Sequence, residues 1–542
     1  MFQKISSTKL LKITVLLSIL VNFVFIFDPV FHSADAVFYA LISKNILTSE
    51  HWYQLMFYGN PWLDKPHLPF WLCAISLKLF GIHSYSYILP GFIFYLIGGY
   101  YTYLSAKTLF GEQVALYSAV LYFCTLHLLL SNIDLRAESF LLGEIIPAFY
   151  YLLEADTTRK YKYIIYAAIF SALAMMTKGP FVMVTITSAF FISWIINKQY
   201  SKFISWQLLL YIVLCLVFIL PELIALYLQF DLHPKLTVFG KHGVSGVRWF
   251  FIDSQFGRFF NTGPIVNDNG DVFFFVHTML WAMLPYSLLF VYALVMRFRQ
   301  RHRITQLDRS KLNLLLYAFV PTFVMFSLTK FQLDHYTNII MPFAAIFTAY
   351  FINYTLFANI TNWLQYVISY ILVILAVIIA ILFLPIVAKL VILLLAAILL
   401  VVMLLYRGQN GLIKVLLFPS YAMLLVFFAV SLLAWIYCHK FETGYNVVKI
   451  INQDSKPVYM LDYDNHSLAF NSESTVYITS DLANIHVHDY YVVSRAVLTD
   501  NPNLILIDKF HGVEVKNMMG VLLHMNKARD RYTDVYLYRN RE

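Results

Sequence analysis

Long apolar runs separated by short polar turns follow one another from residue 10 to about residue 436. A run of roughly 20 apolar residues is long enough to cross about 30 Å of hydrocarbon as a helix. The pattern predicts about thirteen transmembrane helices. They are expected near residues 10–27, 85–105, 114–131, 138–154, 163–177, 180–196, 206–228, 272–296, 312–329, 336–353, 364–384, 387–406 and 412–436.

The composition supports an all-α polytopic membrane protein. Of the 542 residues 60% are hydrophobic and only 13% are charged, and the mean hydropathy is +0.68. A soluble domain of this size needs a larger share of charged residues. The first apolar run follows Lys4, Lys9 and Lys12, as in a signal peptide, but no small-residue cleavage site comes after it. We therefore expect a retained first helix.

The pattern changes after Trp435. Residues 440–542 are polar and contain short stretches in which apolar and polar residues alternate, which predicts a small α/β domain outside the membrane. These stretches are Pro457–Leu461, Thr475–Ile478, Tyr490–Val493, Asn503–Ile507 and Asp534–Tyr538. The chain is thus expected to consist of a transmembrane domain, residues 1–439, and an extracytoplasmic C-terminal domain, residues 440–542.

Two loops of the transmembrane domain are too long to be simple connections. Residues 28–84 contain the amphipathic stretches Val37–Ile46 and Phe70–Phe80, which are expected to lie in the membrane interface. Residues 229–271 form the second loop, which is rich in glycine and aromatic residues. Long loops in compact domains are usually functional.

The net charge of +9 is concentrated in the turns that helix counting places on one side. Under the positive-inside rule this side is cytoplasmic, and the excess charge then reflects orientation and contact with anionic membrane lipids. A nucleic-acid partner is not indicated. The basic turns lie near 106–113, 155–162, 197–205, 297–311, 354–363 and 407–411. The four cysteines form no CxxC pair, so no cysteine metal site or disulfide framework is indicated either.

Two aspartates are expected on the opposite, outer face. Asp35 follows the first predicted helix and Asp134 follows the third. An ionisable residue at the membrane face is usually functional, although a loop carboxylate or a helix cap is the alternative. Such a carboxylate could take the proton of an acceptor hydroxyl as a general base. It could instead orient a sugar or bind a cation.

Several phosphate-binding candidates fall on the same face. Pro66 in Asp64-Lys65-Pro66 suits the first turn of an interfacial helix, which would place Lys65 near a helix N-terminus, a good site for a phosphate. A lysine that snorkels to the head groups is the alternative. Lysine, arginine and tyrosine all donate hydrogen bonds to phosphate oxygens. The other candidates are Lys178, Arg258, Lys330 and Tyr336.

A divalent metal is a weaker hypothesis. Asp64 and His67 could be ligands, but one aspartate and one histidine are thin support. The sequence contains no Walker A loop, no GxGxxG after a strand, no HExxH and no GxSxG. A nucleotide-sugar domain has no room, and an outward-facing enzyme lacks nucleotides. Any activated donor is therefore expected to be linked to a lipid.

The order of these motifs resembles the GT-C superfamily of integral-membrane glycosyltransferases. It is Asp35, Asp64-Lys65-Pro66, Asp134, Thr177-Lys178-Gly179-Pro180 and Lys330…Tyr336. The closest branch looks like families 39 and 83, which hold relatives of the protein O-mannosyltransferases and of the lipid A aminoarabinose transferase. The resemblance covers roughly residues 1–440.

The resemblance implies an inverting transfer of a sugar from a polyprenyl-phosphate donor to a lipid, glycan or protein acceptor. It places this reaction on the periplasmic face of a bacterial inner membrane, in cell-envelope chemistry such as lipid A modification. By this likeness Asp35 is the general base or a carboxylate that positions the acceptor, and Lys65 and Tyr336 hold the donor phosphate with Arg258. Asp134 supports the same cavity, and Asp64 matches an acidic residue that can contact a metal in relatives.

The chain also departs from the family pattern. Relatives usually place an arginine or tyrosine a turn after the acidic residue, whereas here Ala36 and Phe38 follow Asp35, with Tyr39 next. Arg136 and Glu138 are extra charges that could pair with each other or tune the choice of sugar. A transporter or flippase of a lipid-linked sugar is the alternative function, but transporters more often show inverted repeats and broken helices. A structural or receptor role is the third option.

Overall fold

The computed structural model describes residues 7–49, 51–268, 270–300, 302–354, 359–405, 411–498, 501–514 and 532–540. The chain divides into two compact units. Unit 1 consists of Met1–Val24, Leu63–Pro69 and Gly91–Val430, and unit 2 of Phe25–Trp62, Phe70–Pro90 and Ser431–Glu542. The division at residue 440 stays a prediction, and in the structure parts of the first long loop cluster with the C-terminal segment.

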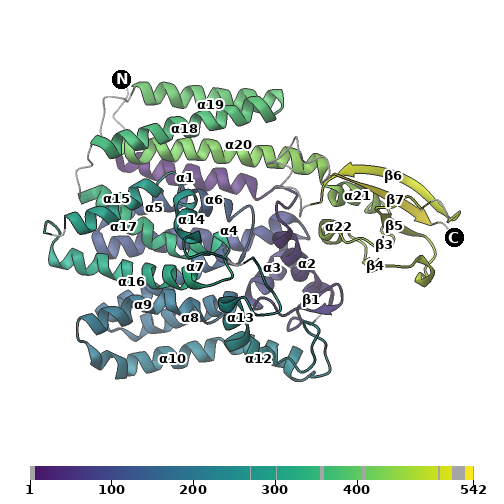
Figure 1. Cartoon of the computed structure of the whole chain (residues 1–542), viewed down its shortest axis with the longest axis horizontal. Coiled ribbons are helices and arrows are strands. Elements are labelled where there is room, and N and C mark those ends of the chain that lie inside the picture. Colours follow the sequence, from purple (N-terminus) through teal and green to yellow (C-terminus); the bar gives the residue numbers. More distant parts are fainter. Residues whose placement is uncertain are drawn as a thin grey trace. The chain divides into compact units, whose positions relative to one another are not determined.

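Unit 1 is built from helices (Figure 1). Each apolar segment that the sequence singles out is helical over most of its described length. The first group is α1 (Ser7–Phe25), α4 (Ser84–Phe110), α5 (Glu112–Phe123), α6 (Leu126–Leu130), α7 (Ala137–Thr158), α8 (Tyr161–Lys178), α9 (Val182–Ile196), η1 (Tyr200–Ile204), α10 (Trp206–Phe218), α11 (Leu220–Leu226) and η2 (Tyr227–Asp231). The second group is α12 (Gly246–Arg248), η3 (Trp249–Asp253), α13 (Ser254–Phe260), α14 (Phe274–Ala282), α15 (Ser287–Arg299), α16 (Gln306–Leu328), η4 (Asp334–Ile340), α17 (Met341–Tyr354), α18 (Asn359–Phe383), α19 (Ile386–Leu405), η5 (Ile413–Leu417) and α20 (Phe418–Phe441).

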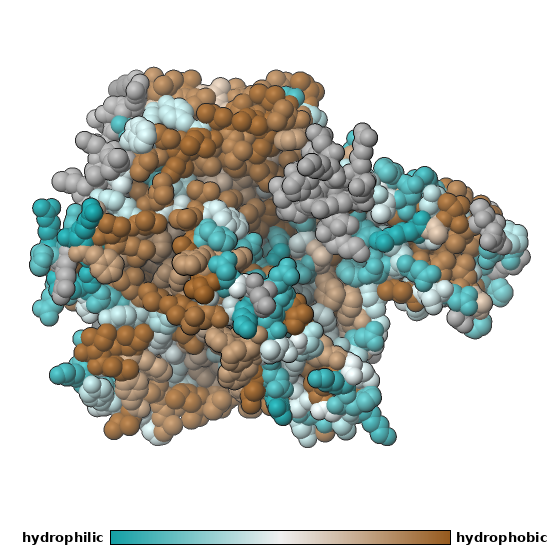
Figure 2. All heavy atoms as spheres, in the orientation of Figure 1, coloured by the Kyte–Doolittle hydropathy of each residue, from teal (hydrophilic) through white to brown (hydrophobic). Residues whose placement is uncertain are grey.

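Six helices in the described residues are long and apolar enough to cross a membrane. The pair α14 and α15 makes a seventh if it counts as one span, although the two helices meet at 117°. Figure 2 shows apolar residues over much of the visible surface of the helical unit. The protein is therefore an integral membrane protein, while the count of thirteen spans stays a prediction.

Small residues let two helices of unit 1 approach closely. A Cβ atom on Gly143 of α7 would collide with the backbone of Phe94 in α4, and one on Gly98 would collide with the backbone of Leu142. Close backbone packing of this kind is how apolar helices associate where lipid removes the hydrophobic driving force. The α4–α7 contact fixes the start of α7, which carries Glu138.

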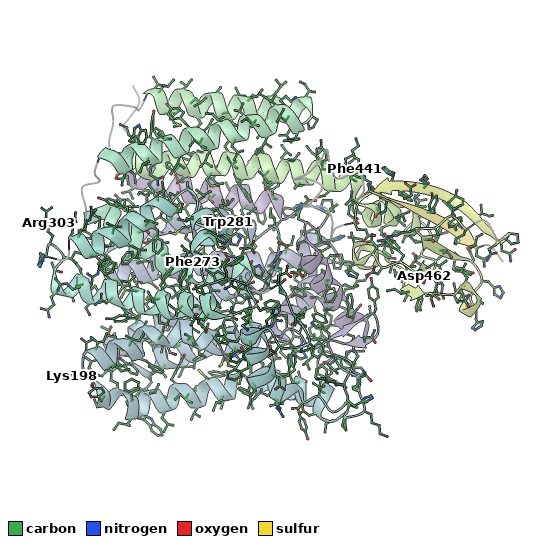
Figure 3. The ribbon with its side chains drawn as sticks, viewed as in Figure 1. Lys198, Phe273, Trp281, Arg303, Phe441 and Asp462 are labelled. Atoms are coloured by element: carbon green, nitrogen blue, oxygen red, sulfur yellow. The ribbon has the colours of Figure 1, made fainter. Side chains whose placement is uncertain are left out.

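Two of the basic turns, 197–205 and 297–311, lie at one end of unit 1. Figure 3 shows Lys198, after α9, and Arg303, before α16, at the same end of the helices in this view. Lys178 lies at the far end of α8 from the basic turn at 159–162, because α8 runs straight from Tyr161 to Lys178. This agrees with the prediction that the basic turns lie on one side and the candidate site on the other.

Unit 2 contains five strands where the sequence alternates. They form one sheet in the order β4-β3-β5-β7-β6, in which β3 pairs in parallel with β4 and β5, and β7 pairs antiparallel with β5 and β6. The strands are β3 (Val458–Leu461), β4 (Val476–Thr479), β5 (Tyr490–Ser494), β6 (Leu504–Gly512) and β7 (Thr533–Asn540). The other elements are α2 (Ala34–Ser49), β1 (Met56–Phe57), β2 (Asn60–Pro61), α3 (Leu68–Phe80), α21 (Thr443–Ile451), α22 (His466–Asn471) and η6 (Leu482–Asn484).

The predicted amphipathic stretches are the helices α2 and α3. Lys44 of α2 donates hydrogen bonds to the backbone carbonyls of Ala469 and Phe470, both at 2.9 Å, and of Ser472 at 2.7 Å. These carbonyls end α22, so a single lysine serves as the C-terminal cap of another helix. The first loop and the C-terminal segment are thereby joined within unit 2.

Candidate functional site

A cavity of about 220 Å³ lies at the end of unit 1 that carries Lys178. Five parts of the chain line it: the segment before α3, the turn between α8 and α9, α13, the end of α16 and η4. Three of its lining residues are cations and one is a carboxylate. Because cations are the residues that bind phosphate, we call it the phosphate cavity. The lining residues are Asp64, Lys65, Lys178, Phe181, Ser254, Gln255, Phe256, Arg258, Phe259, Met325, Phe326, Thr329, Phe331 and Tyr336.

Asp64 joins two of the cations. Its carboxylate forms an ion pair with Lys65, at 3.0 Å between Nζ and Oδ2, and a second with Arg258 through Oδ1. Burial alone would raise the pKa of Asp64, but the charges of Lys65 and Arg258 outweigh it and hold that pKa below its usual range. Asp64 is thus a carboxylate that orients two cations at the cavity wall.

Lys178 is the third cation. Its ammonium pairs with the buried carboxylate of Glu138 and lies 4.0 Å from the centre of the Tyr336 ring. The following Gly179 has a φ of +100°, a conformation that favours glycine, and this turn directs the chain from α8 into α9. Glu138 and Tyr336 therefore fix Lys178 from two sides.

The loop that carries Lys65 is held by a buried pair. Oε2 of Glu222, in α11, accepts a hydrogen bond from the backbone N–H of His67 at 2.9 Å. Oε1 of Glu222 lies 2.9 Å from Nδ1 of the His67 ring. Both residues are fully buried. Pro66 lies two residues before α3, so the prediction that it stands in the first turn of the helix is wrong, and Lys65 lies three residues before the start of α3. The loop owes its position to Glu222 instead.

Asp134 belongs to a polar network outside the cavity lining. Nε of Arg136 donates a hydrogen bond to Oδ2 of Asp134 at 3.0 Å, and Nη2 of Arg136 lies 2.9 Å from the same oxygen. Nη1 of Arg136 also lies 2.8 Å from Nδ1 of His335. The same Nδ1 is 3.1 Å from Oδ1 of Asp334. Glu138 reaches the same network, because its Oε2 lies 3.8 Å from Nε2 of His335. Both interpretations of Arg136 and Glu138 stay predictions.

The structure brings together four of the five predicted phosphate ligands, namely Lys65, Lys178, Arg258 and Tyr336. Lys330 is the exception. Its side chain is exposed and does not line the cavity, while its backbone pairs with Phe259 and Gly270. Asp35 is an exposed residue in the first turn of α2, in unit 2, so its proposed partnership with Asp134 stays a prediction.

The contacts give no support to a metal held by Asp64 and His67. Asp64 faces two cations and His67 faces Glu222. No group of three or more His, Cys, Asp or Glu side chains suited to a metal occurs in the part of the chain that the structure describes. We therefore build no step on a metal.

Sequence reasoning missed Glu222, His335 and Glu144. Glu144 is fully buried in α7 and accepts a hydrogen bond from Thr177 at 2.8 Å, next to Lys178. Glu144 and Glu222 were visible as acidic residues inside apolar runs, a signal that marks functional positions in membrane helices. His335 was visible only as a neighbour of Tyr336.

The chain is similar to known proteins in sequence and in fold. Residues 64–224 match the dolichyl-phosphate-mannose-protein mannosyltransferase family. That segment includes Asp64, Lys65, Glu138, Lys178 and Glu222. A 321-residue stretch is 25% identical to an uncharacterized protein of Aquifex aeolicus (strain VF5), and this match spans 58% of each chain.

The fold is that of a solved glycosyltransferase. The structure of ArnT from Cupriavidus metallidurans bound to undecaprenyl phosphate superposes with a TM-score of 0.72, at 16% identity over 98% of both chains. Its apo state gives a TM-score of 0.69, at 14% identity over 97% of both chains. The resemblance to the GT-C glycosyltransferases is therefore confirmed, as a shared fold and a family match over residues 64–224.

Proposed function

We propose that this protein transfers a sugar from a polyprenyl-phosphate donor to a hydroxyl group of a lipid, glycan or protein acceptor. The reaction takes place on the periplasmic face of a bacterial inner membrane. The observation that carries the proposal is the phosphate cavity, in which three cations and a tyrosine meet a wall of phenylalanines. A polyprenyl phosphate has an anionic phosphate that suits the cations and an apolar chain that suits the phenylalanines.

The cations are suited to the leaving group. In an inverting displacement the acceptor oxygen bonds to the anomeric carbon as the bond from that carbon to the phosphate oxygen breaks. Negative charge then grows on the polyprenyl phosphate. Lys65, Arg258 and Lys178 stabilise this charge, and the Tyr336 hydroxyl donates a hydrogen bond. Asp64 repels the phosphate and acts by orienting Lys65 and Arg258.

The apolar wall receives the start of the polyprenyl chain. Phe181, Phe256, Phe259, Phe326 and Phe331 line the same cavity as the cations. Aromatic side chains offer large apolar contact areas at low cost in conformational entropy. The similar fold of ArnT, which was solved with undecaprenyl phosphate, supports this class of donor.

We assign the general base to Asp35. The resemblance to the GT-C glycosyltransferases implies this role, and Asp35 lies exposed in the first turn of α2. Arg136 engages the carboxylate of Asp134 at 2.9 and 3.0 Å. A carboxylate held by an arginine is a poorer proton acceptor, because the cation stabilises its charged form. Asp134 is then a positioning residue that orders Arg136 beside His335.

The test is turnover by the purified full-length protein in nanodiscs. It is incubated with a panel of polyprenyl-phosphate sugars and a hydroxyl-bearing acceptor, and the release of free polyprenyl phosphate is followed. Asp35→Asn should lower the rate by about 10²–10⁴-fold, the usual effect of losing a general base. Full activity of Asp35→Asn would refute the assignment of the base. Movement of unchanged lipid-linked sugar across the bilayer, without release of polyprenyl phosphate, would instead indicate a transporter.

A further inference from the structure

A second cavity, of about 210 Å³, lies at the opposite end of α8 from the phosphate cavity. We call it the distal cavity. Residues of α7, α8, α9, η1 and α10 line it, among them Ile164 in the first turn of α8. The 18 residues of α8 span about 27 Å at 1.5 Å per residue, close to the hydrocarbon thickness of a bilayer. The residues that line the two cavities therefore lie near opposite ends of a helix about as long as the hydrocarbon layer is thick.

The interior of the distal cavity is apolar. Leu152, Ile164, Phe190, Phe191 and Leu208 line it, and Ile164 and Phe190 are buried. Such walls suit a hydrocarbon chain rather than a sugar or a nucleotide. A binding site of this kind buries the apolar part of its ligand and uses a few polar groups for orientation.

The mouth of the cavity carries a fixed cation. Oδ1 of Asp156 accepts hydrogen bonds from Lys202 at 2.5 Å and from the indole N–H of Trp194 at 3.1 Å. The Lys202 ammonium lies 5.5 Å from the centre of the Trp194 ring. Ser205 donates a hydrogen bond to the carbonyl of Lys202 at 2.7 Å and caps α10. Lys202 is thus held in one place at the rim.

Arg159 supplies a second cation at the mouth. It ends α7 with a φ of +56°, lines the cavity and is exposed. The two turns that form this end, residues 154–162 and 197–205, contain five lysines and arginines and two carboxylates. Their net charge is therefore +3, which favours an anionic over a zwitterionic ligand.

We propose that the distal cavity binds an anionic phospholipid of the leaflet opposite to the sugar donor. One acyl chain enters between α7, α8, α9 and α10, and Arg159 and Lys202 bind the phosphate. This site is separate from the phosphate cavity and does not depend on the proposed transferase activity. It matches the charge of the lipids that basic cytoplasmic segments attract.

The experiment measures lipid binding to the purified, delipidated full-length protein by native mass spectrometry. Dioleoyl-phosphatidylglycerol should bind about 10-fold more tightly than dioleoyl-phosphatidylcholine, the effect of about one charge-assisted contact. Arg159→Gln should reduce this preference, and Arg159→Gln with Lys202→Gln should abolish it. The matched control is Lys160→Gln with Lys198→Gln, which removes the same charge from the same turns but outside the cavity lining.

A second variant tests the apolar half of the site. Thr187 lines the cavity, and Thr187→Trp fills part of it, so bound phosphatidylglycerol should fall while Arg159 and Lys202 are intact. Folding of each variant is checked by its melting temperature. Arg159→Gln breaks no side-chain contact in the described residues, which keeps the test open if the double variant is unstable.

Three results would overturn the proposal. The first is equal binding of phosphatidylglycerol and phosphatidylcholine, or tighter binding of phosphatidylethanolamine. The second is that Lys160→Gln with Lys198→Gln loses as much of the preference for phosphatidylglycerol as Arg159→Gln with Lys202→Gln does. That result would indicate attraction by diffuse surface charge. The third is displacement of bound phosphatidylglycerol by free glycerol phosphate, or a site that accepts undecaprenyl phosphate but no phospholipid.

Discussion

The carboxylate of Glu222 binds His67 twice, with one oxygen 2.9 Å from the imidazole Nδ1 and the other 2.9 Å from the backbone nitrogen. Both residues are fully buried and lie 155 positions apart in the sequence. This contact fixes the backbone next to Lys65, whose ammonium lines the phosphate cavity. Glu222, which we do not expect to touch the substrate, thereby sets the position of Lys65, which we expect to contact it.

Replacing Glu222 with Gln should loosen this loop. The amide cannot accept both hydrogen bonds, so we expect a loss of about 1.5–3 kcal/mol in unfolding free energy, the cost of a charge-assisted hydrogen bond. The KM for the lipid-linked donor should rise about 10-fold and kcat should change less, because donor placement is affected more than chemistry. Thermal unfolding in detergent and steady-state kinetics measure the two effects.

The matched control for Glu222→Gln is Glu112→Gln. Glu112 forms an exposed pair with Lys107 at 2.9 Å. Exposed pairs of this kind contribute little, so stability should change by less than about 0.5 kcal/mol. Unchanged KM and melting temperature in Glu222→Gln would show that the contact between Glu222 and His67 does not position the loop.

The contribution of Asp64 should depend on pH. The pKa of its carboxyl is lower in the folded protein than in the unfolded chain, so the ionised form stabilises the fold at neutral pH. That stability is present above the ordinary aspartate pKa of about 3.9 and is lost as the pH falls below it. The difference in melting temperature between the wild type and Asp64→Asn should therefore shrink below about pH 4. Asp268→Asn removes an exposed carboxylate and serves as the control. A difference that grows in acid would contradict this reasoning.

Lys44→Met should destabilise unit 2. The substitution removes the donor to the carbonyls of Ala469, Phe470 and Ser472, and hydrogen bonds to a charged group contribute about 1.5–3 kcal/mol. Hydrogen exchange at the amides of α22 should increase, because the helix loses its cap. Lys78→Met, at an exposed position of α3, should leave this exchange unchanged. Equal exchange in both variants would show that the cap is dispensable.

The arrangement of secondary structure followed from local patterns. Apolar runs became helices because a backbone in hydrocarbon must satisfy its own hydrogen bonds. The alternating stretches after Pro457 became strands for the reason that one face of a sheet is buried. Counting helices also placed Lys65, Lys178 and Tyr336 at one end, since each lies at the boundary of an apolar run.

The direction of side chains did not follow from those patterns. Lys178 is the last residue of α8 and Lys330 lies two residues after the end of α16, yet of the two only Lys178 lines the phosphate cavity. The difference comes from Glu138, which holds Lys178 and lies 40 residues away in sequence. Arg136 likewise contacts His335, which lies 199 residues away in sequence, as well as the nearby Asp134. Long-range partners of this kind leave no local signature.

The most direct test of the central claim is the affinity of the purified protein for undecaprenyl phosphate, compared between the wild type, Arg258→Gln and Lys330→Gln. Arg258 lines the phosphate cavity and Lys330 does not, although both are cations on the same side of unit 1. We predict that Arg258→Gln weakens binding about 10-fold or more, the effect of one charge-assisted contact, and that Lys330→Gln leaves it unchanged. Equal affinity in all three proteins, or a larger loss in Lys330→Gln, would contradict the assignment of the cavity to the donor phosphate.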